Sequence, residues 1–334
     1  MVYVVCNNAN LKIDGIGDYA YLLCKELINH IPEIRLLSAA SGKRGFINKL
    51  CSLAMMRLLL RLEGKIEEGD VVIIEYPFAE CNMMVLPALK RLKCSLLKKN
   101  GRLILSLHEY DRANFYRKYI IRHIFPLADV VLVTDQAMQC TCRHYVRDVR
   151  IRTIPSNIYQ GEQALSVKDN SQYVFLGLID KTKAINEMVE AWRIFNKNGN
   201  KKLTILTSSI FNNHFESYGI DYKRNLEINE IGEYFKKAAF CILPINPEVG
   251  YNNATYKTAI CFECIPIGHF KQNMDNDSFV ININDNSVCE IHKGLERSAT
   301  MSEEDYSKMK ESIHRQKKPA FRETALQYLD VIRN

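Results

Sequence analysis

Short runs of apolar residues alternate along the chain with longer segments of helical spacing. Runs that are apolar at every position are typical of parallel strands buried on both faces. Between them, apolar residues recur every three or four positions, as in 16–27 and 185–195, which predicts helices. This alternation predicts an α/β fold with parallel sheets in two sets. The expected strands are residues 2–6, 71–74, 103–107, 130–133, 173–177, 203–206 and 240–244.

A length of 334 residues suits two domains. A strand-like stretch at 151–154 is followed by Pro155, Ser156 and a polar segment, so we expect a boundary there. The tail holds two helical patterns, 303–316 and 321–332, with Pro319 between them as a break. The expected division is a first domain at 1–156, a linker at 157–171, a second domain at 172–318 and a final helix at 319–334 that packs back on the first domain.

The composition indicates a globular chain, since 47% of residues are hydrophobic and 25% are charged. No run approaches about 18 uninterrupted apolar residues, and the first residues have neither a basic region nor a cleavage site of small residues. We therefore expect neither a membrane-spanning helix nor secretion, but a cytoplasmic protein. The eleven cysteines are then expected to be reduced and mostly buried.

Neither a metal nor another cofactor is expected. Cys261 and Cys264 have the spacing of zinc ligands but lie in an apolar run without a second pair nearby. Asp275 and Asp277 resemble a metal-binding DxD motif, but they lie late in the chain, where carboxylates need no metal.

Positive charge is concentrated in the first half of the chain. Residues 1–157 hold 23 Lys and Arg against 15 Asp and Glu, whereas residues 158–334 hold 22 against 23. This bias suggests an acidic partner for the first half: a membrane surface, a phosphate-bearing acceptor or nucleic acid. Basic residues recur in the apolar stretches 43–62 and 117–123, which fits an anionic membrane surface or a solvated helix face. No nucleic-acid-binding motif is present, and nucleic acid is not the expected partner.

Candidate chemistry in the first half follows the expected strands. In open parallel sheets, ligands bind beyond the carboxyl ends of the strands. Gly15 and Gly17 precede a helix and let backbone N–H groups approach a phosphate or a sugar, with a plain helix start as the alternative. His108 is suited to hydrogen bonding a sugar hydroxyl or to acid–base chemistry, unless it is structural. For Glu75 a structural role is the simpler interpretation.

In the second half, Gly177 and Lys183 follow the expected strand 173–177 and lead into a helix. An ammonium group and the free N–H groups of a helix start can act on the same phosphate. This arrangement predicts an anion site, although surface lysines are often only solvated.

A later loop contains Asn253, Ala254 and Thr255, which begin a further helix that could also point at phosphate. Capping alone would account for Asn253 and Thr255. Glu248, in the same loop, is a candidate catalytic or sugar-binding carboxylate, with simple exposure as the alternative.

The order of these loops resembles the GT-B glycosyltransferases, above all the retaining, nucleotide-sugar-dependent glycosyltransferase family 4. The resemblance covers nearly the whole chain through residues 15–19, 70–77, 105–109, 128–134, 177–187, 238–244 and 265–268. It implies a GT-B fold of two Rossmann-like parallel-sheet domains facing a cleft, with the acceptor on the N-terminal domain and the nucleotide sugar on the C-terminal domain. It aligns Lys183 with the lysine that binds the donor diphosphate, and it implies that no metal is required.

At the donor site the chain departs from this family. Leu178 stands where the family has a diphosphate-binding arginine. Tyr251 and Ala259 stand where it has a pair of glutamates, the second of which usually holds the donor ribose. Glu248 could replace the first glutamate if the loop lengths differ.

The resulting expectation is a hexosyltransferase that moves a sugar from a nucleotide-sugar donor to a lipid-linked or polymeric glycan in bacterial surface or capsular polysaccharide synthesis. His108 and Glu248 would be catalytic, and the donor would contact Gly15, Gly17, Gly177, Lys183, Asn253, Ala254 and Thr255. The protein would lie in the cytoplasm, with peripheral attachment to the inner membrane face as an option. Two alternatives stay open: a non-catalytic glycosyltransferase-like subunit, which the missing donor residues favour, and a sugar-nucleotide epimerase.

Overall fold

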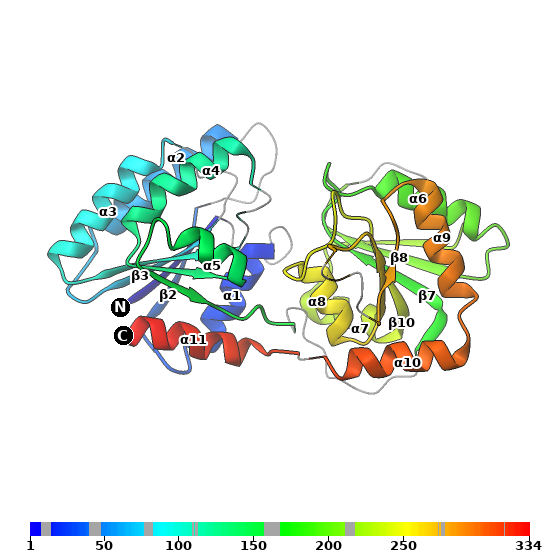
Figure 1. Cartoon of the computed structure of the whole chain (residues 1–334). Helices are drawn as coiled ribbons and strands as arrows, with labels where there is room; N and C mark the ends of the chain where they lie inside the picture. Colours follow the sequence, from blue (N-terminus) through cyan, green and yellow to red (C-terminus); the bar gives the residue numbers. More distant parts are fainter. Residues whose placement is uncertain are drawn as a thin grey trace. The chain divides into compact units, whose positions relative to one another are not determined.

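The computed structural model describes residues 1–7, 15–39, 48–76, 83–108, 110, 113–156, 168–210, 218–272, 274, 278–316 and 318–334. These residues form two compact units, one made of 1–155 with 319–334 and the other of 156–318 (Figure 1). Each unit is built around a six-stranded parallel sheet.

Unit 1 contains a sheet in the order β2-β1-β3-β4-β5-β6. Its strands are β1 (Val2–Cys6), β2 (Ile34–Ser38), β3 (Val71–Tyr76), β4 (Arg102–Leu107), β5 (Val130–Val133) and β6 (Asp148–Ile151). Its helices are α1 (Gly15–Leu27), α2 (Asn48–Glu63), α3 (Leu86–Lys98), α4 (Phe115–Ile124), the short η1 (Phe125–Leu127), α5 (Gln136–Cys142) and α11 (Phe321–Arg333).

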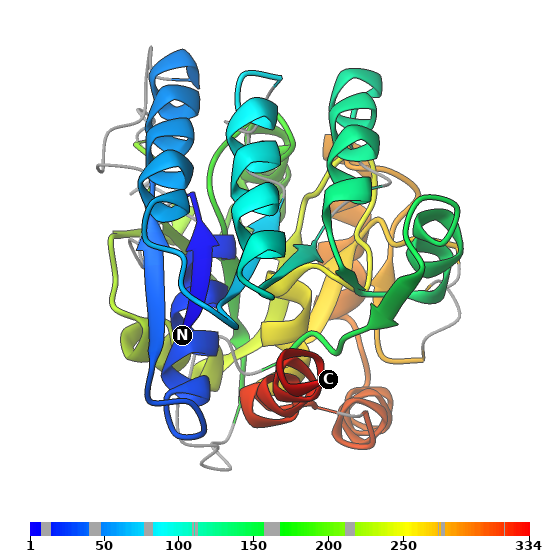
Figure 2. The ribbon, with the colours of Figure 1, turned by 90° about the vertical axis from the view of Figure 1, so that its left-hand side faces the viewer.

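The two faces of this sheet are covered by different helices. α2, α3 and α4 lie side by side on one face, whereas α1 and α11 cover the other (Figures 1 and 2). Strand side chains alternate between the faces. Ile74 and Tyr76 therefore join the apolar core under α2, α3 and α4, whereas Glu75 between them reaches Tyr328 of α11.

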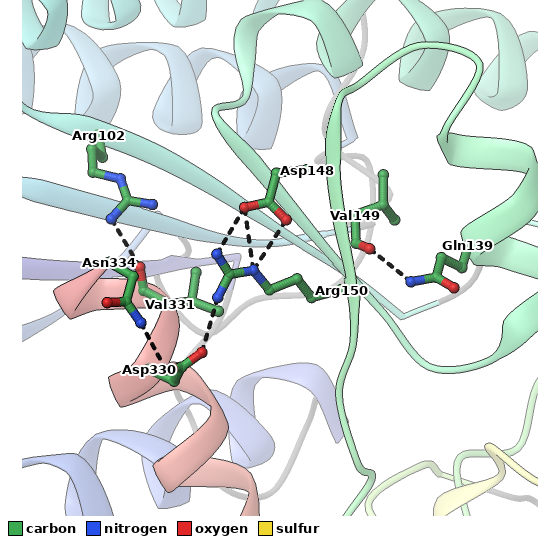
Figure 3. Close-up of polar contacts among 8 residues, drawn as sticks. All are labelled: Arg102, Gln139, Asp148, Val149, Arg150, Asp330, Val331 and Asn334. Atoms are coloured by element: carbon green, nitrogen blue, oxygen red, sulfur yellow. Dashed lines mark hydrogen bonds and ion pairs between the residues drawn. The ribbon is translucent and has the colours of Figure 1, made fainter.

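Helix α11 packs on the sheet of unit 1 although it lies at the C-terminal end of the chain. Arg150 of β6 forms ion pairs with Asp148 and with Asp330 of α11, each with an N···O distance of 2.9 Å (Figure 3). Arg102 of β4 donates to the carbonyl oxygen of Val331 at 3.0 Å. Phe321, Tyr328 and several neighbours are buried, so both apolar packing and polar contacts fix the helix on the sheet.

Unit 2 contains a sheet in the order β12-β11-β10-β7-β8-β9. Its strands are β7 (Asp169–Leu176), β8 (Lys202–Thr207), β9 (Ile220–Arg224), β10 (Ala238–Leu243), β11 (Ile265–Gly268) and β12 (Ile281–Asn282). Its helices are α6 (Ile185–Phe195), α7 (Ile228–Lys237), α8 (Ala254–Cys261), α9 (Val288–Ala299) and α10 (Glu303–His314). Trp192 of α6 is fully buried against Tyr173 of β7 in the core.

Two local expectations were wrong. The strand expected at 151–154 is β6, which ends at Ile151, because residues 148–151 pair with β5 and the next residue, Arg152, is drawn into a buried polar cluster. Gly15 and Gly17 do not lie in a loop: both belong to the first turn of α1, so their backbone is helical.

Candidate functional site

In unit 2, the carboxyl end of β7 brings together three segments that are separate in sequence. Gly177 directly follows the strand with a φ of +154°, a conformation that favours glycine. A Cβ at this position would lie 3.7 Å from Cε of Lys183, so the Gly177 backbone and the Lys183 side chain are neighbours. Lys183 itself pairs with Ile245, beyond the end of β10, in an isolated bridge, and its Nζ lies 3.0 Å from Oγ1 of Thr182.

The third segment is the start of α8. Asn253 caps this helix, and its side chain accepts a hydrogen bond from the Tyr256 backbone N–H at 2.9 Å. The buried Thr255 donates from its hydroxyl to the carbonyl oxygen of Leu176 at 2.9 Å. That bond ties the first turn of α8 to the last residue of β7, next to Gly177.

Electrostatics at this end of unit 2 favour an anion. The N-terminus of α8 carries a partial positive charge. Lys257 lies in the same part of α8, and its burial lowers the pKa of its ammonium group. A cation near a helix N-terminus is unfavourable by itself. An anion bound there would stabilise both the Lys257 ammonium group and the N-terminus of α8. Glu248 is half-buried in the loop that precedes α8.

In unit 1, the carboxyl end of the sheet carries a buried hydrogen-bonded cluster. Glu75 of β3 is completely buried, and its Oε2 lies 2.7 Å from Nε2 of His108, the residue that follows β4. The other carboxylate oxygen accepts a hydrogen bond from the Tyr328 hydroxyl at 2.9 Å. Tyr328 is also 2.6 Å from the hydroxyl of Ser106.

Arg152 adds a buried positive charge to the cluster, with only 1% of its surface exposed. Its Nη2 lies 3.0 Å from Nδ1 and 3.2 Å from Nε2 of His108, so this nitrogen lies over the imidazole ring rather than along one lone pair. Its Nη1 donates to the Tyr19 hydroxyl at 3.2 Å. Within the described part of the chain, no carboxylate forms an ion pair with Arg152, and its Nε has no hydrogen-bond partner.

These contacts set the ionisation of the cluster. Burial by itself raises the pKa of Glu75, but the hydrogen bond from His108 and the charges of His108 and Arg152 outweigh it, so the pKa of Glu75 is lowered. Glu75 is therefore ionised and accepts a hydrogen bond from the Nε2–H group of His108, which fixes the orientation of the imidazole ring. Burial raises the pKa of Tyr19 and Tyr328, which keeps both phenols protonated as donors.

The structure thus gathers the expected residues into two groups. Gly177, Lys183, Asn253, Ala254 and Thr255 meet in unit 2, with Glu248 in the adjoining loop. His108 lies in unit 1 with Glu75, for which the sequence favoured a structural role. The sequence Asp275–Asp277 and most of the basic stretch before α2 lie outside the described residues.

Arg152, Tyr19 and Tyr328 were missed by the sequence interpretation. Tyr19 lies inside a helical pattern and Tyr328 in a tail helix, where each is a typical core aromatic. Arg152 lay inside the stretch 151–154, which we expected to be a strand, whereas the observed strand ends at Ile151. Only the position of Arg152 directly after a strand could have indicated a site.

Within the described residues, no group of three or more His, Cys, Asp or Glu side chains is arranged to hold a metal ion. In the same residues, no helix combines the length and the apolar character needed to cross a bilayer.

No protein-family model matches the sequence, and no curated protein matches it. Solved structures do match over the full length. HepE of Anabaena, in complex with UDP and glucose, is 8% identical with a TM-score of 0.68, and 99% of each chain is covered. An α-glucosyltransferase in complex with UDP and a mismatched DNA is 11% identical with a TM-score of 0.60, over 100% of this chain and 99% of that one.

A proposed UDP-N-acetylglucosamine 2-epimerase from Listeria monocytogenes is 8% identical with a TM-score of 0.62, covering 99% of this chain and 95% of that one. At such low identities the similarity establishes the fold. The two six-stranded parallel sheets with flanking helices are the two Rossmann-like domains of the GT-B fold.

Proposed function

We propose that this chain is a glycosyltransferase that transfers a sugar from a nucleotide-sugar donor to a glycan acceptor. The observation that carries the proposal is the meeting of Gly177, Lys183 and the α8 N-terminus at the carboxyl end of β7. A diphosphate binds well where a glycine lets the backbone approach closely and where an ammonium group and the free N–H groups of a helix N-terminus supply positive charge. HepE and the α-glucosyltransferase, both similar in fold, hold UDP, so UDP-sugars are the first donors to test.

In the proposed reaction, the acceptor hydroxyl attacks the anomeric carbon while the bond to the nucleotide diphosphate breaks, and the hydroxyl proton passes to the departing diphosphate. The leaving diphosphate gains negative charge, which Lys183 and the α8 N-terminus would stabilise without a metal ion. Leu178 supplies no charge, so Lys183 and Lys257 would supply most of the side-chain charge at this site. Glu248 would act near the sugar, as a partner for its hydroxyls or for the developing charge.

We assign the acceptor to unit 1, with His108 as its candidate catalytic residue. The imidazole, held by Glu75, presents a fixed surface to a sugar hydroxyl. We further propose a retaining mechanism like that of family 4. The acceptor would be a lipid-linked or polymeric glycan in the synthesis of a bacterial surface polysaccharide. The protein would work in the cytoplasm, with peripheral attachment to the inner membrane face.

The proposal is tested by the thermal stability of the protein with UDP, GDP, CMP and dTDP sugars. One nucleotide class should raise the melting temperature by several degrees, because a ligand that binds only the folded state stabilises it. Lys183→Ala should abolish the shift. Lys181→Ala, which removes an exposed lysine of the same turn, is the matched control and should preserve it. Absence of a shift with every nucleotide would contradict a donor site and favour a non-catalytic subunit.

A specific observation also supports an epimerase as the second candidate, since the Listeria protein shares the fold over nearly the full length. Incubation of the protein with a UDP-sugar and no acceptor separates the two reactions. Release of a C2 epimer would favour the epimerase. An unchanged donor that is consumed only when a glycan is added would favour the transferase.

A further inference from the structure

The helices on one face of unit 1 are strongly basic. We call this the α2–α4 face: the helices α2, α3 and α4, which lie side by side (Figure 2). Together they contain ten Lys and Arg and one acidic residue, Glu63. Glu63 pairs with Arg91, and Lys93 pairs with Asp129. Among the side chains that the structure describes, most of the positive charge of this face is therefore not balanced within it.

Helix α4 also exposes aromatic side chains. Phe115 is 83% exposed, Tyr116 54% and Tyr119 45%. Arg122 and His123 continue the same stripe, because positions separated by three or four residues share one helix face. The opposite side of α4 is apolar and buried in the core of unit 1. The exposed aromatic residues are therefore not needed to anchor the helix to its own sheet.

The cations of α4 have aromatic rather than acidic neighbours. The Lys118 ammonium lies 5.6 Å from the centre of the Tyr110 ring. Arg122 donates to the Tyr110 hydroxyl at 3.2 Å. As far as the structure describes the chain, no carboxylate pairs with Arg117, Lys118 or Arg122. This side of unit 1 thus combines aromatic rings with cations that have no acidic partner among the described residues.

Two methionines extend the exposed apolar surface that the aromatic residues of α4 form. Met83 and Met84 are 38% and 47% exposed and directly precede α3. Because β3 and β4 are parallel, α3 and α4 both begin beyond the carboxyl ends of these strands. Met83, Met84 and Phe115 therefore lie toward the carboxyl ends of the strands, the end of the sheet at which His108 also lies.

We propose that the α2–α4 face docks on an anionic lipid bilayer, with Phe115, Tyr116 and Tyr119 entering the headgroup region. Aromatic rings favour the membrane–water interface, and each basic residue near an anionic leaflet contributes about 1 kcal/mol of attraction. Docking through the start of α4 would bring the carboxyl ends of the strands of this sheet near the membrane, where a lipid-linked acceptor lies. The proposal names the surface for the peripheral attachment proposed above, but vesicle binding does not depend on sugar transfer.

The test is co-sedimentation of the whole protein with vesicles, without donor or acceptor. Vesicles containing about half phosphatidylglycerol should bind the protein at least about tenfold more strongly than phosphatidylcholine vesicles, and added salt should weaken the binding. Replacing the aromatic residues together, by Phe115→Ser, Tyr116→Ser and Tyr119→Ser, should lower the partition coefficient about tenfold or more.

A matched control replaces three exposed apolar residues of the opposite face. The changes Tyr21→Ser, Ile28→Ser and Leu326→Ser should leave vesicle binding within about twofold. Circular dichroism and melting curves confirm that both triple variants are folded. Equal binding to neutral vesicles, no vesicle binding, or wild-type binding by the α4 triple variant would overturn the proposal. Binding of a DNA duplex but not of vesicles would overturn it too, and would place a nucleic acid on this face.

Discussion

Tyr328 and Glu75 are 253 residues apart in sequence, yet the Tyr328 hydroxyl donates to the Glu75 carboxylate at 2.9 Å. Both side chains are fully buried. The last helix of the chain is therefore part of the polar cluster that holds His108 at the end of the first sheet. A buried carboxylate is stable only when its oxygens are hydrogen-bonded, so α11 contributes to the charge state of this site as well as to its packing.

Tyr328→Phe should destabilise the protein by about 1–2 kcal/mol, because it leaves Glu75 and Ser106 with fewer hydrogen bonds in a buried place. Urea unfolding measures this change. Tyr306→Phe is the matched control, since Tyr306 is also buried but its hydroxyl has no hydrogen-bond partner among the described residues. That variant should keep or slightly raise the stability. Equal effects of the two changes would argue against a specific role for the Tyr328 hydroxyl.

Glu75→Gln should change how stability depends on pH. Folding lowers the pKa of Glu75 from its ordinary value of 4.5. The unfolded chain therefore binds this proton more readily, and the stabilisation is present above about pH 4.5 and lost as the pH falls through the lower folded value.

At about pH 7, Glu75→Gln should lose roughly 3 kcal/mol of unfolding free energy, because Arg152 keeps its buried charge without Glu75. The difference from wild type should shrink as the pH falls below about 4.5. Urea unfolding at several pH values checks this. Glu304→Gln, at an exposed glutamate, should follow the wild-type curve. A constant difference at all pH values would show that Glu75 is not ionised in the folded protein.

His108→Ala should leave nucleotide binding intact and lower sugar transfer by about 100-fold, since positioned groups of this kind contribute at least that much. The nucleotide-induced melting shift and the rate of transfer are measured on the same variant. His30→Ala removes an exposed histidine of unit 1 and should affect neither. Near-normal transfer by His108→Ala would remove His108 from the proposed site.

The strands that could be predicted are those with nearly continuous apolar runs, which lie in the interior of each sheet. All residues of β1, β3, β5 and β10 are buried, which explains why continuous apolar runs marked them. The edge strands β2 and β9 were not predicted, because partial exposure lets polar residues alternate with apolar ones. A local pattern of this kind does not distinguish an edge strand from a loop.

The sequence indicated candidates that directly follow a strand and candidates at the start of a helix. His108 and Gly177 are of the first kind, since the carboxyl ends of parallel strands lie at one end of the sheet, and Asn253 and Thr255 are of the second. Tyr328 reaches Glu75 only through the docking of α11 on the sheet, which no local pattern encodes. Arg152 is charged and fully buried, an arrangement that hydrophobic periodicity cannot predict, because the reason for its burial is a set of long-range partners.

Gly177→Ala should disturb the proposed donor site more than the fold. The new Cβ would lie 3.4 Å from Cζ of Phe175 and 3.7 Å from Cε of Lys183, at a φ of +154° that a residue with a side chain rarely adopts. We expect a loss of about 1–2 kcal/mol of stability and a nucleotide-induced melting shift reduced to less than about half.

Gly199→Ala separates these two effects. Gly199 also has a positive φ, +65°, but nothing lies within 4 Å of its Cβ position. This variant should therefore lose a comparable amount of stability through backbone strain alone, and should keep the full nucleotide shift. If Gly177→Ala binds nucleotide as well as Gly199→Ala does, the Gly177 turn does not hold Lys183 in a binding position, and the diphosphate must be sought elsewhere in unit 2.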